Sequence, residues 1–167
     1  IEACLVGSEM CIRDSNYTEA NSWQYSFFVP HDISGLINLH GGSALFNLKL
    51  NELFNSNSTI EGRKQADITG LIGQYAHGNE PSHHMAYLYN SSGRPEKSQF
   101  MVNKILNELY HSSPSGISGN EDCGQMSSWY VLSAIGLYDI NPGDPYYIIQ
   151  TPYVEESSLN LENGKVF

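Results

Sequence analysis

The amino-acid sequence predicts a mainly α-helical protein in which helices alternate with polar, glycine-containing loops. Apolar residues recur at helical spacing in several segments, and glycine-rich stretches such as SSPSGISGNEDCG separate them. β-Branched and aromatic residues typical of a strand gather only near the end, in DPYYIIQTPYV. Paired inner and outer helices of this kind can close into a toroid, although their alternation alone does not establish closure.

The first predicted helices are short. Glu19 precedes an aromatic run, and Asp32 is expected to cap a helix over ISGLINLH. The segment GGSALFNLKLNELF predicts an amphipathic helix, with Leu45, Leu48 and Phe54 near helical spacing.

The later elements follow the same scheme. Asp67 is expected to cap a short helix over ITGLIGQYA, and the turn SSGRP ends the next helix. SQFMVNKILNELYH predicts an amphipathic helix whose inward residues are Phe100, Ile105, Leu106 and Leu109. MSSWYVLSAIGLY is apolar almost all round, which predicts a buried inner helix.

Composition excludes several classes of protein. The 167 residues are enough for one domain with a core, and the mean hydropathy of -0.34 is that of a globular chain. A net charge of -10 argues against nucleic acid or an anionic membrane as partner. No apolar run approaches the roughly 18 residues that span a bilayer. The three cysteines form no CxxC pair, so neither a disulfide framework nor a zinc knuckle is indicated.

The opening residues 1–15, IEACLVGSEMCIRDS, have neither helical nor strand periodicity. We interpret them as non-native sequence joined at about Ser15, which leaves residues 16–167 as part of a domain. The missing initiator Met, and a final LENGKVF that resembles a strand cut off mid-element, also indicate a fragment.

The stretch HGNEPSHHMAYLY carries the densest group of polar residues. Pro81 suits the first turn of a helix, which places Asn79 and Glu80 at the helix N-terminus. His83 and His84 then open an apolar run. Ionisable groups at the mouth of a buried helix suit a binding site, and the alternative is a helix cap with two core histidines.

Three loops, TEANSWQY, HGNEPSHH and GNEDCGQMSSWY, place an acid beside aromatic residues. Aromatic faces with carboxylates suit sugar recognition, and two separated carboxylates can act as general acid and general base. Burial against Trp23 and Tyr25 is expected to keep Glu19 protonated, whereas Asp122 is expected to stay ionised and activate a water. The alternative is that these acids only cap helices.

Two other chemistries remain open. The oxygens of Asn79, Glu80 and Asp122, with Glu121, suit calcium. Zinc would need Glu80 with the two adjacent histidines, but adjacent helical side chains point about 100° apart and no HExxH occurs.

Cys123 with a histidine base would instead make an amidase. The flanking Asp122 disfavours the thiolate, so a small buried cysteine is the preferred interpretation.

The segments YTEANSWQYSFFVPHDISGL, HGNEPSHHMAYLYN and GNEDCGQMSSWYVLSAIGLY closely resemble glycoside hydrolase family 92, the calcium-dependent exo-acting α-mannosidases. The resemblance runs from Asn16 to the end and includes PGDPYYIIQTPY. It implies an incomplete (α/α)6 toroid, preceded in full-length members by an N-terminal β-sandwich domain.

The resemblance implies an inverting mechanism in which Glu19 is the general acid and Asp122 the general base. Asn120 stands where a second Asp often assists. Inversion requires roughly 6.5–9.5 Å between the two carboxyl groups, so Glu19 and Asp122 are expected to face each other at that separation.

The resemblance also implies ligand contacts. Its calcium neighbourhood corresponds to Gln24, Asn79 and Glu80. The expected substrate contacts are Trp23, His77, Gly78, His83 and His84, with His77 lining the subsite of the leaving sugar. Members selective for α-1,2 linkages carry Glu where this chain has Gly78, so that selectivity is not expected.

The expected partners are mannose-containing glycans, with neither nucleic acid nor membrane, and the family implies a periplasmic or secreted location. The fragment alone is expected to be poorly stable or inactive. The alternative from another class is a non-catalytic carbohydrate-binding helical domain, whose sugar binding would survive Glu19→Gln.

Overall fold

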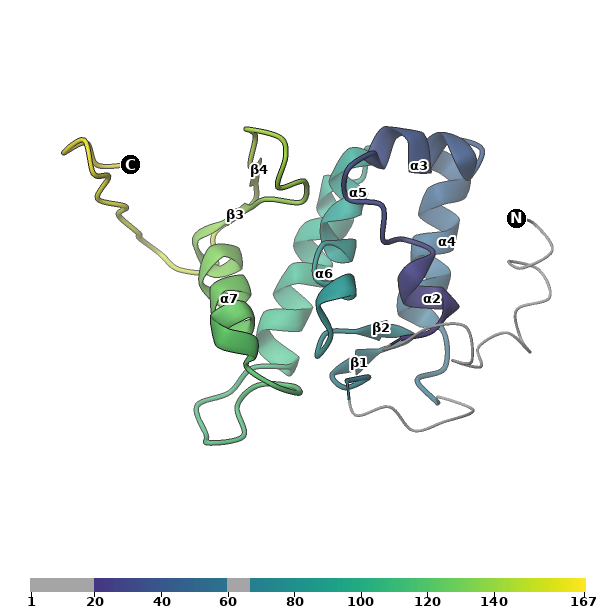
Figure 1. Cartoon of the computed structure of the whole chain (residues 1–167), viewed down its shortest axis with the longest axis horizontal. Helices are drawn as coiled ribbons and strands as arrows, with labels where there is room; N and C mark the ends of the chain where they lie inside the picture. Colours follow the sequence, from purple (N-terminus) through teal and green to yellow (C-terminus); the bar gives the residue numbers. More distant parts are fainter. Residues whose placement is uncertain (1–19, 60–66) are drawn as a thin grey trace.

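The computed structural model describes residues 20–59 and 67–167, which form a mainly helical fold with two small antiparallel sheets (Figure 1). The α-helices are α2 (Ser22–Tyr25), α3 (Ile33–Leu39), α4 (Ser43–Asn55), α5 (Leu88–Ser91), α6 (Pro95–Glu108) and α7 (Gln125–Ile135). The 3-10 turns are η2 (Glu80–Ser82), η3 (Met85–Tyr87) and η4 (Asp122–Gly124). The strands are β1 (Leu71–Ile72), β2 (Tyr75–Ala76), β3 (Leu137–Tyr138) and β4 (Ile148–Ile149). The predicted mainly α class is confirmed.

The core lies around η3 and α5, where every residue from 85 to 89 is at most 2% exposed. Helix α6 contacts both α5 and α7, and in Figure 1 it stands between α7 on one side and α3 and α4 on the other. None of the described helices is long and apolar enough to cross a membrane.

A β-hairpin replaces the helix predicted over residues 68–76. Strands β1 and β2 pair antiparallel, and Gly70 and Gly73 adopt φ of 62° and 61°, a conformation that interrupts a helix. The turn packs on the end of α4, because Gln74 N donates to Leu53 O at 2.8 Å. A Cβ on Gly73 would lie 2.4 Å from the same oxygen, which explains the glycine.

Helix α4 forms where it was predicted, and Asp32 caps α3 as expected by accepting from Gly35 N at 2.8 Å. The predicted buried face of α4 is wrong in part, because Leu45 and Leu48 are more than half exposed. The face that packs on the core contains Phe46, Asn47, Leu50, Leu53 and Phe54.

Helix α6 begins at Pro95, and its predicted inward residues Ile105 and Leu106 are buried. Phe100 is 68% exposed, which contradicts the prediction, because Met101 and Val102 take the inward positions of that turn.

Helix α7 buries one face rather than its whole circumference. Trp129 is 1% exposed, whereas Val131 is 55% exposed. The predicted all-round burial is therefore wrong for the described part of the chain.

The strand predicted in DPYYIIQTPYV is confirmed by β4, which pairs with β3 directly after α7. The last residues, expected to be an interrupted strand, turn back on themselves through the bridge between Asn160 and Val166. They extend away from the helices (Figure 1).

Candidate active site

Glu80 is the first residue of η2, and Pro81 lies next to it in the first turn. The predicted helix start at this proline is confirmed, although 3-10 turns lead into α5 where one α-helix was expected. Glu80 is exposed, whereas all residues from 81 to 89 are buried. This segment therefore presents a carboxylate at the surface from a firmly packed base.

Asp122 lies on a strained loop. Asp122 and Cys123 have φ of 53° and 56°, and Gly124 follows at 102°. A left-handed residue other than glycine costs about 1–2 kcal/mol. The loop is held where α7 begins, because Glu121 Oε1 accepts a hydrogen bond from Ser127 N at 3.0 Å. Strain at an exposed acid is a feature found at functional sites.

The side chains of Asp122 and Glu80 lie close enough for their charges to interact. Loss of water around the carboxyl, followed by the charge of Glu80, raises the pKa of Asp122, and Asp67 and Glu121 add to the effect. A raised pKa makes the Asp122 carboxylate a better proton acceptor.

No ion pair neutralises this acid pair within the described ranges. The salt bridges found there are Lys49–Glu52 on α4, Arg94–Glu96 at the start of α6 and Lys104–Glu108 on α6. Closely spaced carboxylates without a basic partner favour a cation. However, no group of three or more His, Cys, Asp or Glu side chains in residues 20–59 and 67–167 is arranged as a metal centre.

Gln24 belongs to a buried hydrogen-bonded network on α2, a helix that contacts η2. Its Oε1 accepts from Asn21 N at 3.0 Å, and its Nε2 donates to Gln74 O. Asn21 Oδ1 in turn accepts from Trp23 N at 2.9 Å. The Asn21 side chain also accepts from the backbone of Gln24, which completes a capping box. The hydrogen bond from Asn21 N leaves the second lone pair of Gln24 Oε1 open, so direct cation binding by Gln24 stays a prediction.

The remaining predicted residues of this region differ in how far they are exposed. Trp23 is half-buried on α2, and Asn120 is exposed two residues before Asp122. Asn79 is 2% exposed immediately before Glu80. Glu19 lies outside the described residues, so its separation from Asp122 stays a prediction.

His77 is a fully buried part of a hydrogen-bonded chain. Its Nε2 lies 2.6 Å from Tyr110 Oη, which is 3.2 Å from Met126 O. Because the carbonyl can only accept, Tyr110 donates to it and accepts from His77 Nε2. His77 Nδ1 then accepts from Tyr75 Oη at 2.7 Å.

This position has two consequences for His77. Burial lowers its pKa well below the usual range, so the ring is neutral. The ring is also 0% exposed, which disagrees with the predicted contact with a leaving sugar. In this structure His77 supports the core beneath the acid pair.

His83 and His84 are both buried and hydrogen-bonded to backbone. His83 Nε2 donates to His77 O at 2.9 Å, and His84 Nε2 donates to Phe27 O at 2.7 Å. Burial lowers the pKa of both rings. The alternative of two core histidines is the one this geometry supports, and direct sugar contact disagrees with it. Zinc binding through both rings disagrees for the same reason.

Gly78 lies where three segments converge. A Cβ on Gly78 would lie 1.9 Å from Thr69 Oγ1 and 3.2 Å from Ser118 O, and one on Gly119 would lie 2.9 Å from Thr69 Oγ1. A glutamate at position 78 would therefore require Thr69 to move.

Cys123 is exposed with a free thiol, so the prediction that it is buried is wrong. Its left-handed backbone turns the side chain outward from the start of α7. The nearby His83 is occupied by His77 O and by Gln125. A Cys–His pair of the kind that an amidase needs is therefore not formed by these residues.

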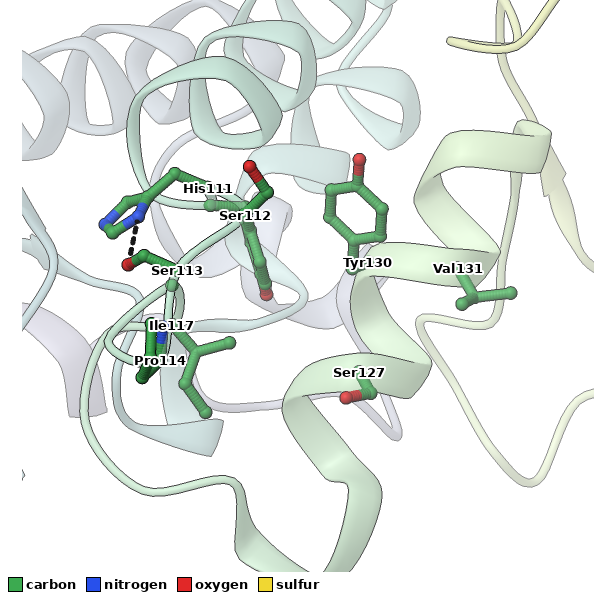
Figure 2. Close-up of a pocket in the computed structure, with 10 residues that line it drawn as sticks. His111, Ser112, Ser113, Pro114, Ile117, Ser127, Tyr130 and Val131 are labelled. Carbon is green, nitrogen blue, oxygen red and sulfur yellow. Dashed lines mark hydrogen bonds between the residues drawn. The ribbon is translucent and has the colours of Figure 1, made fainter.

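A cavity among the described residues lies away from the acid pair. It has a volume of about 550 Å³ between the loop at residues 111–117 and the face of α7 that carries Ser127, Tyr130 and Val131 (Figure 2). Neither Glu80 nor Asp122 lines it.

Sequence reasoning missed Tyr110, Gln125 and Trp129, which tie the two acid-bearing segments together. One signal was available for Gln125, because it follows Asp122 by the same three positions that separate His83 from Glu80.

The fold and the site define a helical protein that presents carboxylates from helix-starting loops above buried aromatic residues, an arrangement suited to cleaving glycosides. The chain belongs to glycosyl hydrolase family 92, because the profile of the glycosyl hydrolase family 92 catalytic domain matches residues 7–167. The resemblance seen in the sequence is confirmed.

Similar proteins support this assignment. An uncharacterized secreted glycosidase of Arthroderma benhamiae is 35% identical over 141 residues, covering 84% of this chain and 16% of the relative. The α-mannosidase BT3965 of Bacteroides thetaiotaomicron, solved with mannoimidazole, is 41% identical with a TM-score of 0.81, covering 89% of this chain and 20% of that one.

The inverting mannosidase BT2199 of Bacteroides thetaiotaomicron is 36% identical with a TM-score of 0.74. That match covers 90% of this chain and 21% of the mannosidase. This chain therefore spans about a fifth or less of the length of these relatives.

Proposed function

We propose that the protein containing this chain hydrolyses terminal α-mannosidic linkages in glycans with inversion of configuration. The observation that carries the proposal is the contact between Asp122, on its strained loop, and Glu80. Membership of family 92 and the mannosidases among the solved relatives supply the substrate class.

In this proposal Asp122 removes a proton from the attacking water, and Glu19 protonates the leaving oxygen. The raised pKa of Asp122 favours the first step because it strengthens the base. The two carboxyl groups would stand roughly 6.5–9.5 Å apart, which leaves room for the water. Asn120 replaces an assisting acid, so Asp122 would act without a second carboxylate at that position.

Calcium is proposed as the cofactor, held by the oxygens of Asn79 and Glu80. The fit rests on oxygen donors and on the uncompensated contact between Glu80 and Asp122. When bound, calcium supplies a positive charge that binds sugar hydroxyls. Gln24 is the third proposed member of this site, and its hydrogen bonds to Asn21 and Gln74 fix α2 against the hairpin.

Substrate recognition is proposed to use the aromatic face of Trp23, which is half-buried on α2. A pyranose presents C–H groups that pack on such a face. The other predicted contact residues, His77, His83 and His84, are buried. In this proposal they support the site through packing and do not touch the sugar.

The rest of the family 92 architecture is also part of the proposal: completion of an (α/α)6 toroid, a preceding β-sandwich domain and a periplasmic or secreted location. Residues 16–167 would form part of that toroid, and residues 1–15 would be extraneous. The fragment alone would then be inactive, because Glu19 and Asp122 need the remaining helices to enclose the sugar.

The test is an assay of the complete protein on α-linked mannobiosides, with the anomer of the released mannose followed by NMR. We expect β-mannose as the first product, loss of activity in EDTA, and recovery with calcium. Magnesium is the matched control ion. Release of α-mannose first would overturn inversion, activity unchanged by EDTA would overturn the calcium role, and no hydrolysis of any α-mannoside would overturn the function.

A further inference from the structure

The two acid-bearing segments contact each other at two points that lie three residues apart on each segment. Glu80 is the first residue of η2 and His83 follows its last residue, three positions later. Asp122 and Gln125 lie three residues apart where η4 leads into α7. The carboxyl groups of Glu80 and Asp122 form the first contact. One turn further on, Gln125 Nε2 lies 3.1 Å from His83 Nδ1. The segments therefore run side by side in a fixed register.

The direction of the second contact follows from its neighbours. His83 Nε2 lies 2.9 Å from His77 O, and a carbonyl oxygen can only accept, so Nε2 carries the ring proton. Nδ1 of the neutral ring is then an acceptor, and the Gln125 amide donates to it. A methionine or glutamate at position 125 could not make this bond.

His83 is a rigid partner for Gln125. It is 2% exposed, and its backbone oxygen also accepts from Trp129 Nε1 at 3.0 Å. Trp129 lies one turn beyond Gln125 on α7. The start of α7 is thus anchored to a buried histidine of the opposite segment by two side chains.

Asp122 lies on the strained part of this region. It is exposed, and its backbone lies in the left-handed region, as does that of the next two residues. Its orientation therefore depends on where the first residue of α7, Gln125, is fixed.

We propose that Gln125 is a positioning residue for the proposed general base: its hydrogen bond to His83 holds the Asp122 loop in register with Glu80. This inference rests on the proposed function. A displacement of about 1 Å at a catalytic group can lower the rate about 100-fold. We expect Gln125→Met, which keeps the length but loses the donor, to lower kcat by 10- to 100-fold with KM changed less than threefold.

The experiment measures kcat and KM of the complete protein on an activated aryl α-mannoside for Gln125→Met, Asp122→Asn and the double variant. Gln99→Met, at an exposed position of α6, is the matched control and should leave both constants unchanged. Because Gln125 acts through Asp122, it should have less than a twofold further effect once Asp122 is replaced.

Each outcome supports or overturns the positioning role of Gln125. A kcat loss that disappears in the Asp122→Asn background supports the positioning role. An equal loss in both backgrounds, a change confined to KM, or no loss overturns it while wild-type hydrolysis leaves the proposed function intact. A wild-type protein that hydrolyses no α-mannoside overturns the proposed function and this inference with it.

Discussion

The two segments that bring Glu80 and Asp122 together are built in opposite ways. Behind Glu80 the chain is buried for nine consecutive residues, and its histidines bond to backbone carbonyls. Around Asp122 the chain is exposed and strained, and a hydrogen bond from Ser127 N to Glu121 fixes it where α7 begins. A firmly packed acid suits a binding role, whereas a strained, exposed acid suits a reacting one.

The largest expected effect separates the roles of these two acids. Asp122→Asn should lower kcat about 10³-fold with little change in KM, because it removes the proposed base. Glu80→Gln should mainly raise the calcium concentration needed for half-maximal activity. Calcium-dependent kinetics of the complete protein measure both. Asp144→Asn, at an exposed loop position, is the control, and equal kcat losses in the two main variants would contradict the assignment.

The next effect concerns packing beneath Glu80. Gly78→Ala should destabilise this region by about 3 kcal/mol, because the new Cβ would overlap Thr69 Oγ1. Thr69→Ala should restore most of the loss, since Thr69 Oγ1 is buried without a hydrogen-bond partner in the described part of the chain. Hydrogen exchange of residues 67–84 measures the change. Additive effects of the two substitutions would contradict the overlap.

A smaller effect is expected from the chain of hydrogen bonds under both segments. Tyr110→Phe leaves His77 Nε2 and Met126 O without their partner, which should cost about 1–3 kcal/mol. Tyr130→Phe is the matched control on α7. Thermal unfolding of the complete protein should show a lower midpoint for the first variant only. Equal midpoints would show that water replaces the hydroxyl.

In the strained loop at Cys123, we expect one substitution to increase stability. Cys123→Gly should stabilise the start of α7 by about 1 kcal/mol, because glycine adopts a φ of 56° without the Cβ clash. Cys123→Val should destabilise it, since a β-branched residue fits this conformation worst. Exchange rates of residues 119–130 give the comparison, and the reverse order would rule out strain as the cause.

The smallest effect is a pH dependence of stability from the packed segment. Burial lowers the pKa of His84, so the unfolded chain binds a proton that the folded chain does not. Stability should therefore fall as the pH drops below about 6.5, the usual histidine value. His84→Gln should make the fall shallower, as measured by urea unfolding at pH 7 and pH 5. A slope unchanged by the substitution would assign the fall to other groups.

Local sequence signals were enough to predict the elements that interactions within a few residues determine. Pro81 and Pro95 mark helix starts, and Asp32 caps α3 through its own side chain. Motif-length matches were enough for the family. Elements whose cause is distant were missed: the hairpin at residues 71–76 depends on docking to Leu53 O as well as on its two glycines.

The sequence by itself determined the helical class, the family and the two acid-bearing segments, because capping, proline and motif length act within short stretches of chain. Only the tertiary structure decided which side chains face inward. It buried His77, His83 and His84 and exposed Phe100 and Cys123. It also brought Asp122 against Glu80 across 42 positions, since burial and like-charge contact depend on neighbours that are remote in the chain.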